Sequence, residues 1–169
     1  MEFYEVLKKR RSIRKYKKVP VEQDKIDRIL EAVRIAPSAK NAQPWHLIVI
    51  KDENVRLGLR EAYGSAWFTD APVIICACGE PAKAWVRRDG KSYLDVDVAI
   101  AFEHLILAAA AEGLGTCWIG AFDPTAVKRV LGLPGGIEPL AMTPLGYPDE
   151  TPRPFSRKST AEIVRNEKW

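Results

Sequence analysis

The sequence is poor in residues that bind metals or form disulfides. Its 169 residues include three cysteines and two histidines. Cys76 and Cys78 lie two positions apart in the run Val73–Cys78, which is typical of a buried strand and matches no metal-binding spacing. Because three cysteines cannot all pair within one chain, we interpret them as small buried residues in a reducing compartment. We therefore predict no metal site and no disulfide framework.

The sequence also lacks long hydrophobic segments. No apolar run approaches the roughly 18 residues of a membrane span. The first residues do not have the basic-then-apolar order of a secretory leader. We expect a protein without a membrane partner that works in the cytoplasm.

Several catalytic and nucleotide-binding motifs are missing as well. The chain has no GxxxxGK[ST] loop, no G-x-S-x-G elbow and no Cys–His arrangement for nucleophilic catalysis. Gly113 and Gly115 are followed by Trp118 where a dinucleotide-binding motif has its third glycine, and they follow an expected helix instead of a strand. These absences exclude a Rossmann site and a P-loop.

The composition is that of a globular protein, with 47% hydrophobic and 28% charged residues, and we expect one domain over residues 1–169. Helical spacing predicts helices over 2–9, 21–35, 54–62, 98–112 (capped by Asp97) and 124–131 (capped by Asp123). Apolar runs predict strands over 46–50, 72–78, 116–119 and 140–145. Because these elements follow no βαβ rhythm, the predicted class is α+β, with a mainly antiparallel sheet flanked by helices. The proline-rich tail over 147–158 is expected to be extended and to lie across another subunit.

A basic cluster stands near the N-terminus, where eight of the eleven residues from Lys8 to Lys18 are Lys or Arg. Such a run can be a nucleic-acid-binding arm or a solvated surface. Arg10, Arg11, Ser12 and Arg14 also suit a phosphate, because guanidinium groups bind phosphate oxygens in pairs and a hydroxyl adds a donor. In an extended segment alternate residues project to opposite sides, which sets Arg11 apart from the other three.

A polar loop, Pro37–Trp45, follows about twenty residues later. Prolines pre-order its two ends, and Ser38, Asn41 and Gln43 between them suit a flat polar ring. A phosphate cluster together with a ring-binding loop indicates a nucleotide-like cofactor, and flavin mononucleotide (FMN) is the obvious candidate.

These motifs resemble, in order along the chain, those of the FMN-dependent nitroreductase family. The resemblance is carried by RRSIRKY at 10–16, APSAKNAQPW at 36–45 and EGLGTCWIG at 112–120, and continues through DAP at 70–72, Asp97, GYP at 146–148 and RK at 157–158. It spans almost the whole chain. It implies an intertwined homodimer with two FMN sites at the subunit interface.

The resemblance also implies which residues bind the cofactor. The phosphate and ribityl chain would be bound by Arg10, Arg11, Ser12, Arg157 and Lys158. The ring would be bordered by Arg14, Pro37, Ser38, Ala39, Asn41, Ser65, Trp118, Ile119 and Gly120. Arg14 would stabilise the negative charge of the reduced ring. The loop over 37–41 would come from the other subunit, and the N–H near Gly120 would face flavin N5, where the absent side chain permits a close approach.

The implied activity is that of an NAD(P)H oxidoreductase, in which a hydride passes to flavin N5 and the electrons then pass to a small planar nitroaromatic or quinone in a ping-pong sequence. No side-chain acid or base is required, so no catalytic residue is assigned.

Two departures from the family pattern leave other functions open. Ala39 replaces a small polar residue, and Ser65 stands where many relatives carry Asn. The segment over 81–93 is the candidate lid, and Trp67 would either wall the pocket or fill the core. A specialised relative, either a reductive dehalogenase or an oxygenase that consumes reduced flavin, is one alternative. A nucleic-acid-binding module using the Lys8–Lys18 run is the other, whereas the favoured reading has no nucleic-acid partner.

Overall fold

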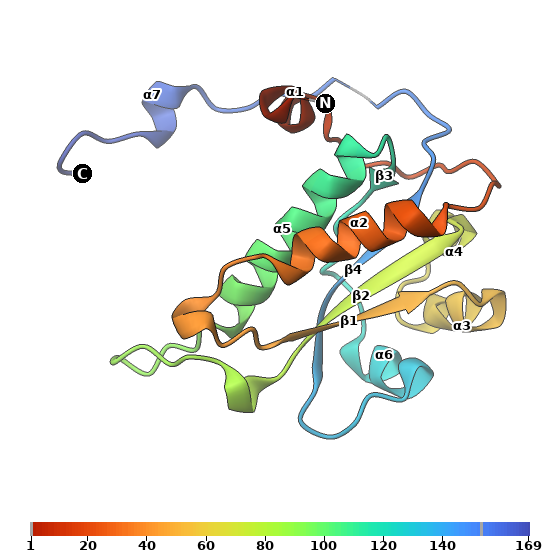
Figure 1. Cartoon of the computed structure of the whole chain (residues 1–169), viewed down its shortest axis with the longest axis horizontal. Coiled ribbons are helices and arrows are strands. Elements are labelled where there is room, and N and C mark those ends of the chain that lie inside the picture. Colours follow the sequence, from red (N-terminus) through yellow and green to blue (C-terminus); the bar gives the residue numbers. More distant parts are fainter. Residues whose placement is uncertain (1, 153) are drawn as a thin grey trace.

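The structure is a computed structural model that describes residues 2–152 and 154–169. Its centre is a four-stranded sheet in the order β1-β2-β4-β3, in which every pair of neighbouring strands is antiparallel. The strands are β1 (Trp45–Ile50), β2 (Val73–Gly79), β3 (Gly115–Thr116) and β4 (Glu138–Gly146). The α-helices are α1 (Phe3–Lys9), α2 (Gln23–Arg34), α3 (Glu53–Gly58), α4 (Ala66–Asp70), α5 (Leu94–Ala111), α6 (Pro124–Leu131) and α7 (Thr160–Ile163). Helices on both sides of the sheet confirm the predicted α+β class (Figure 1).

The central strand β2 is buried along its whole length. Its alternate side chains enter two separate cores, with Val73, Ile75 and Ala77 in one and Ile74 and Cys76 in the other. A strand covered on both faces has no polar side chains to alternate with apolar ones, which explains its continuous apolar sequence. The three cysteines are free and buried, as predicted.

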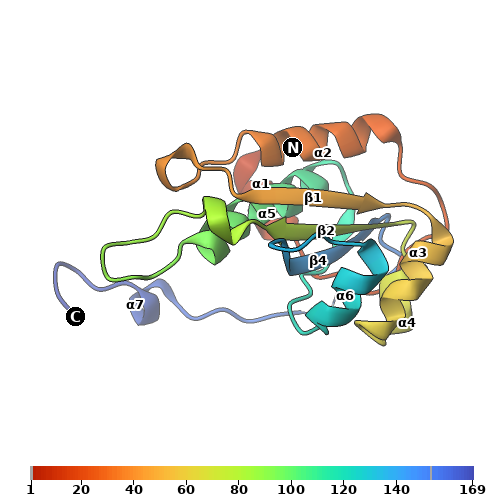
Figure 2. The ribbon, with the colours of Figure 1, turned by 90° about the horizontal axis from the view of Figure 1, so that it is seen from below.

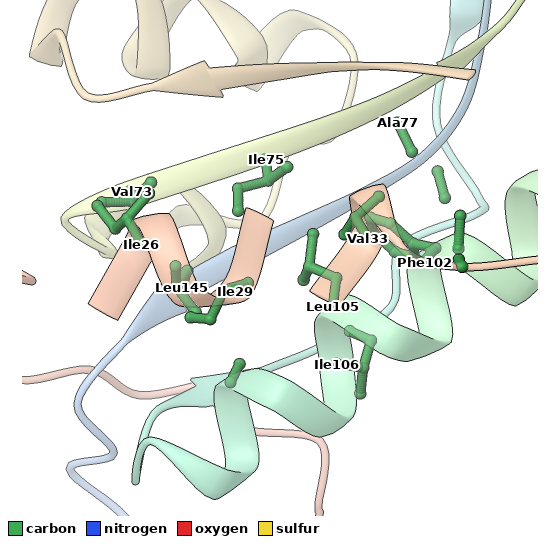
Figure 3. Packing of buried hydrophobic residues seen from close by; sticks show 14 of the residues in the cluster. Ile26, Ile29, Val33, Val73, Ile75, Ala77, Phe102, Leu105, Ile106 and Leu145 are labelled. Carbon is green, nitrogen blue, oxygen red and sulfur yellow. The ribbon is translucent and has the colours of Figure 1, made fainter. Parts of the chain in front are cut away.

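One face of the sheet is covered by α2 and α5. The α2 stripe of Ile26, Ile29 and Val33 packs between β2 and the α5 side chains Phe102 and Leu105 (Figure 3). Burying each such side chain stabilises the fold by about 1.5–3 kcal/mol. On the other face, α4 and α6 lie opposite α2 (Figure 2) and contribute to the second core.

The N-cap of α6 is the one that the sequence predicts, whereas the glycine that ends the helix was not singled out. The Asp123 carboxylate accepts a hydrogen bond from the Thr125 N–H at 2.8 Å, Pro124 opens the helix, and Gly132 ends it in the left-handed conformation at φ 62°. Both signals are local in sequence, so they can be read without the tertiary structure.

The predicted start of the long apolar helix is wrong. Helix α5 begins at Leu94 after Tyr93, and Asp97 lies inside it. The Ser92 hydroxyl accepts a hydrogen bond from the Leu94 N–H at 3.2 Å, and Tyr93 is held by its N–H donating to the Trp85 carbonyl at 2.9 Å. These two bonds fix an earlier helix start and leave the Asp97 side chain available for another contact.

Other boundaries also differ from the predictions. The strand expected over 116–119 is shorter, because after β3 the Cys117 N–H donates to the Thr143 side chain and the ladder resumes with a bridge between Ile119 and Met142. The helix expected over 54–62 divides into α3 and a 3-10 turn, Leu59–Glu61. Helices α4 and α7 were not predicted.

The chain after β4 first pairs with the N-terminal basic segment and then leaves the body. Tyr16 and Pro148 form an antiparallel bridge, and the Asp149 N–H donates to the Lys15 carbonyl at 2.9 Å. Residues 154–169 extend away from the sheet and carry α7 (Figures 1 and 2). Of the helices in the described part of the chain, none combines the length and apolarity needed to span a membrane.

Candidate functional site

The basic segment is held against the end of the sheet by backbone bonds. Ser12 forms a parallel bridge with Thr116 of β3, and the Ile13 N–H donates to the Thr116 carbonyl at 2.8 Å. Ile13 is buried against Gly115, where an added Cβ would lie 2.8 Å from the nearest Ile13 atom. The buried Tyr16 hydroxyl donates to the Ile13 carbonyl at 2.5 Å. The segment is therefore fixed at both ends, with its arginine side chains left at the surface.

A cavity of about 620 Å³ lies beside this segment. Its lining is Arg10, Arg11, Ser12, Arg14, Glu150, Thr151, Pro152, Pro154, Phe155 and Arg157. The expected alternation is not kept, because Arg11 lines the same cavity as Arg10, Ser12 and Arg14. The reason is that the segment is no regular strand: it forms one bridge with β3, at Ser12, and among residues 10–14 Ile13 is the buried one.

The tail closes this cavity with residues that the sequence did not single out. The Phe155 ring contacts two guanidinium groups, with the Cζ atoms of Arg11 and Arg157 each 4.2 Å from its centroid. The Glu150 carboxylate accepts a hydrogen bond from the Arg14 N–H at 2.5 Å. Arg157 thus joins the predicted cluster, whereas Lys158 is exposed and lies outside the cavity lining. No local signal marks Phe155 or Glu150, because their contacts with Arg11 and Arg14 join residues over 130 positions apart.

The segment that follows Thr116, the bridge partner of Ser12, carries the next group of predicted site residues. Cys117 is buried, its thiol contacts Ser12, and burial raises its pKa while nearby Arg14 opposes that rise. Trp118 is 43% exposed and packs edge-on against Phe102, with ring centroids 4.6 Å apart. Ile119 is buried, and both its backbone groups bond to Met142.

Gly120 follows at an exposed position. Within the described residues no backbone or side-chain acceptor takes its N–H. A Cβ added there would meet only the Trp118 indole, at 3.8 Å. The Gly120 N–H is therefore left without an acceptor in the described part of the chain, and the space that a side chain would occupy at this position is open apart from the indole.

Ser65 precedes α4, which brings this part of the chain toward Arg14. The Arg14 guanidinium lies 5.9 Å from the centroid of the Trp67 ring, and both line a second cavity of about 510 Å³. Trp67 also packs edge-on against Tyr63 at 5.9 Å. It therefore both walls the surface near Arg14 and contacts the core.

The polar loop lies apart from this cluster, at the opposite end of α5 (Figure 1). The Ala39 N–H donates to the Asp97 carboxylate near the start of α5, whereas Ala110, near its end, lines a cavity with Arg10 and Arg11. At about 1.5 Å of rise per residue these two ends are about 20 Å apart along the helix. One chain thus places Pro37, Ser38, Ala39 and Asn41 away from the arginines. The candidate lid over 81–93 projects from the same end as the loop (Figure 1).

Comparisons with known proteins show the family of the chain. A family model described as the nitroreductase family matches residues 7–68 and 59–147. An NADH dehydrogenase of Thermus thermophilus is 34% identical over 195 residues, covering 92% of this chain and 91% of the relative. An FMN reductase [NAD(P)H] of Bacillus subtilis 168 is 34% identical over 155 residues, covering 82% and 62%. The crystal structure of a nitroreductase family protein from Clostridium difficile 630 superimposes with a TM-score of 0.91 at 36% identity, covering 100% of both chains.

The family match and these relatives define the class of the protein as an FMN-dependent NAD(P)H oxidoreductase. The chain belongs to the nitroreductase family, as the sequence motifs predict.

Proposed function

We propose that the cavity beside the basic segment holds the phosphate end of FMN, and that the protein passes electrons from NAD(P)H to a small planar acceptor such as a nitroaromatic or a quinone. As a nitroreductase family member, the protein is an oxidoreductase that uses FMN and NAD(P)H. The observation that carries the proposal is the gathering of Arg10, Arg11, Arg14 and Arg157 around one cavity.

The donors around the cavity fit a phosphate group. Guanidinium groups form paired, charge-assisted bonds to phosphate oxygens, and Ser12 adds a hydroxyl. Glu150 is the acidic residue of the described lining, so the arginines leave a strong positive excess for an anion. The same placement disfavours the nucleic-acid alternative, because these arginines face a cavity, while Lys9 and Lys15 of the run pair with Glu5 and Asp149.

The groups beyond the phosphate suit a flat ring with polar edges. When bound, FMN supplies the redox chemistry, accepting a hydride from NAD(P)H and passing the electrons to the acceptor in a ping-pong sequence. Arg14 would hold the ring edge that becomes negative on reduction. The Gly120 N–H would donate to the ring from a backbone that no side chain shields. Trp118 and Ser65 would border the ring.

A homodimer would complete the site. The loop residues Pro37, Ser38, Ala39 and Asn41 lie at the far end of α5 from the arginines, so a two-fold partner is needed to bring such a loop to the cavity. Exposed apolar side chains support a subunit interface here. They are Val96 and Ile100 on α5 and Phe3, Tyr4 and Leu7 on α1.

The experiment compares how variants retain FMN and riboflavin, which differ only in the phosphate. Arg10→Gln and Arg157→Gln should weaken FMN binding at least tenfold and leave riboflavin binding unchanged. Arg129→Gln is the control, because Arg129 is an exposed arginine of α6 paired with Glu61. Equal losses for the two flavins would refute the phosphate assignment. A colourless wild-type protein that takes up no added FMN would refute the proposed function.

A further inference from the structure

The loop that carries Ser38, Ala39 and Asn41 has an unusual backbone. Lys40, Asn41 and Gln43 adopt the left-handed conformation, at φ 51°, 55° and 47°. Residues with a side chain rarely adopt these angles, and they persist only where surrounding structure enforces them. The loop must therefore be held by specific contacts.

Some of these contacts come from within the loop. The Ser38 hydroxyl accepts from the Gln43 N–H at 2.9 Å, and the Asn41 N–H donates to the Ser38 carbonyl at 3.0 Å. Two contacts come from outside. The Glu80 N–H donates to the Pro44 carbonyl at 2.8 Å at the loop's exit, and Asp97 Oδ1 accepts from the Ala39 N–H at 2.9 Å at its turn.

Asp97 is an unexpected residue at its position. It is 1% exposed on the buried side of α5, beside the buried Leu94, Val98 and Ala101, whereas Asp95 of the same turn is exposed. Its Oδ2 is buried without a hydrogen-bond partner in the described part of the chain. A buried carboxylate is costly, and an apolar side chain of similar size would pack here without that cost. Stability alone therefore does not explain an aspartate at this position.

We propose that Asp97 is a positioning residue for the flavin reaction: by holding the Ala39 N–H it fixes the strained loop in the form that presents Ser38 and Asn41 to the cofactor. The proposal rests on the proposed function. It assigns to α5 a second role besides filling the core, because the same helix carries the anchor of the loop.

Two substitutions remove the anchoring bond from opposite sides. Asp97→Leu removes the acceptor and leaves an apolar side chain in an apolar surrounding. Ala39→Pro removes the donor without touching α5, and it fits the local backbone, because Ser38 before it is extended at φ −144° and ψ 161° and Ala39 opens a 3-10 turn. Asp97→Asn is the conservative variant, since its amide oxygen can still accept from Ala39.

The expected result is that both disrupting variants fold, that their FMN dissociation constants rise about tenfold, the effect of losing one ordering hydrogen bond, and that the visible circular dichroism of bound FMN changes. The double variant should be no worse than either single one, because both remove the same bond. Asp97→Asn should restore most of the affinity. In the flavin-free protein, amide hydrogen exchange over residues 38–43 should become at least tenfold faster in both disrupting variants.

The matched control is Asp52→Leu. The Asp52 carboxylate also accepts from a backbone N–H, that of Val55 at 3.0 Å, but it caps α3 beyond the far end of β1 from the loop. This variant should lose stability and keep the wild-type FMN affinity and spectrum.

Unchanged FMN affinity, spectrum and loop exchange in both Asp97→Leu and Ala39→Pro would overturn the role of Asp97 while leaving the proposed function intact. If Asp97→Leu fails to fold, Ala39→Pro decides by the same readouts. A wild-type protein that binds no FMN would overturn both proposals. Arg10→Gln distinguishes failure of the phosphate assignment from failure of the loop assignment, because it changes the phosphate site and leaves the loop unchanged.

Discussion

Thr143 makes the sharpest test of how the strand end carrying Trp118–Gly120 is held. Its side chain is fully buried, accepts from the Cys117 N–H at 3.0 Å and donates to the Pro144 carbonyl at 2.9 Å. Thr143→Val keeps almost the same shape and leaves no cavity, so it removes only these two hydrogen bonds. Thr143→Ser keeps the hydroxyl and removes one methyl group.

The two variants separate hydrogen bonding from packing. Leaving the buried Cys117 N–H without an acceptor costs about 1–3 kcal/mol. Removing one buried methyl group costs about 1 kcal/mol. We therefore expect wild type to be most stable, Thr143→Ser to lose about 1 kcal/mol and Thr143→Val to lose about 2 kcal/mol.

Urea titration at one fixed protein concentration measures this order, since the proposed dimer would make stability depend on concentration. With a slope of about 2 kcal/mol per molar urea, Thr143→Val should lower the midpoint by about 1 M. Thr125→Val, at an exposed position of α6, is the control and should change stability by less than about 0.5 kcal/mol. If Thr143→Val proves as stable as Thr143→Ser or more so, packing and not the bond to Cys117 holds the strand end.

Three further predictions concern other parts of the fold. Tyr16→Phe removes the hydrogen bond to the Ile13 carbonyl and should cost about 1 kcal/mol. Because burial raises the pKa of Tyr16, the folded chain keeps a proton that the unfolded chain loses above about pH 10, so wild-type stability should fall as the pH rises through that range. Urea titrations at about pH 9 and 11 should show a smaller fall in the variant. Gly132→Ala should cost about 1 kcal/mol in urea titration because φ is 62° there, whereas Gly135→Ala, with open space and no positive φ, should not. Ile100→Asp should give monomers that retain no FMN, whereas Arg10→Gln should lose FMN and stay dimeric, as size-exclusion chromatography with light scattering and absorbance will show.

Features that depend on neighbouring residues in sequence were predictable. The apolar stripe of α2, the continuous apolar run of β2 and the N-cap of α6 each express a local rule, and the structure confirms them. The arginine cluster was recognisable because guanidinium groups and a hydroxyl suit a phosphate wherever the chain places them.

Features that depend on distant partners were not predictable. The strand over 116–119 is interrupted because a side chain 26 residues away, Thr143, takes the place of a backbone acceptor. Glu150 and Phe155 join the cavity only because the chain after β4 runs past Arg14 and Arg11 before it leaves the body. For Asp97 a signal did exist, since a carboxylate at the start of a largely apolar helix needs a reason, but the sequence offered helix capping as the simpler one.

Helix α5 explains why one chain does not bring the two halves of the proposed site together. Its apolar body fills the core, its start anchors the polar loop through Asp97, and its end borders the cavity of Arg10 and Arg11. A rigid helix about 20 Å long between these points keeps the two groups apart within a subunit. In an isologous dimer each contact occurs twice, so one interface that brings one loop to the partner's arginines necessarily builds both sites. Loss of the dimer would then remove both sites together, so that flavin retention and subunit association would fail as one event.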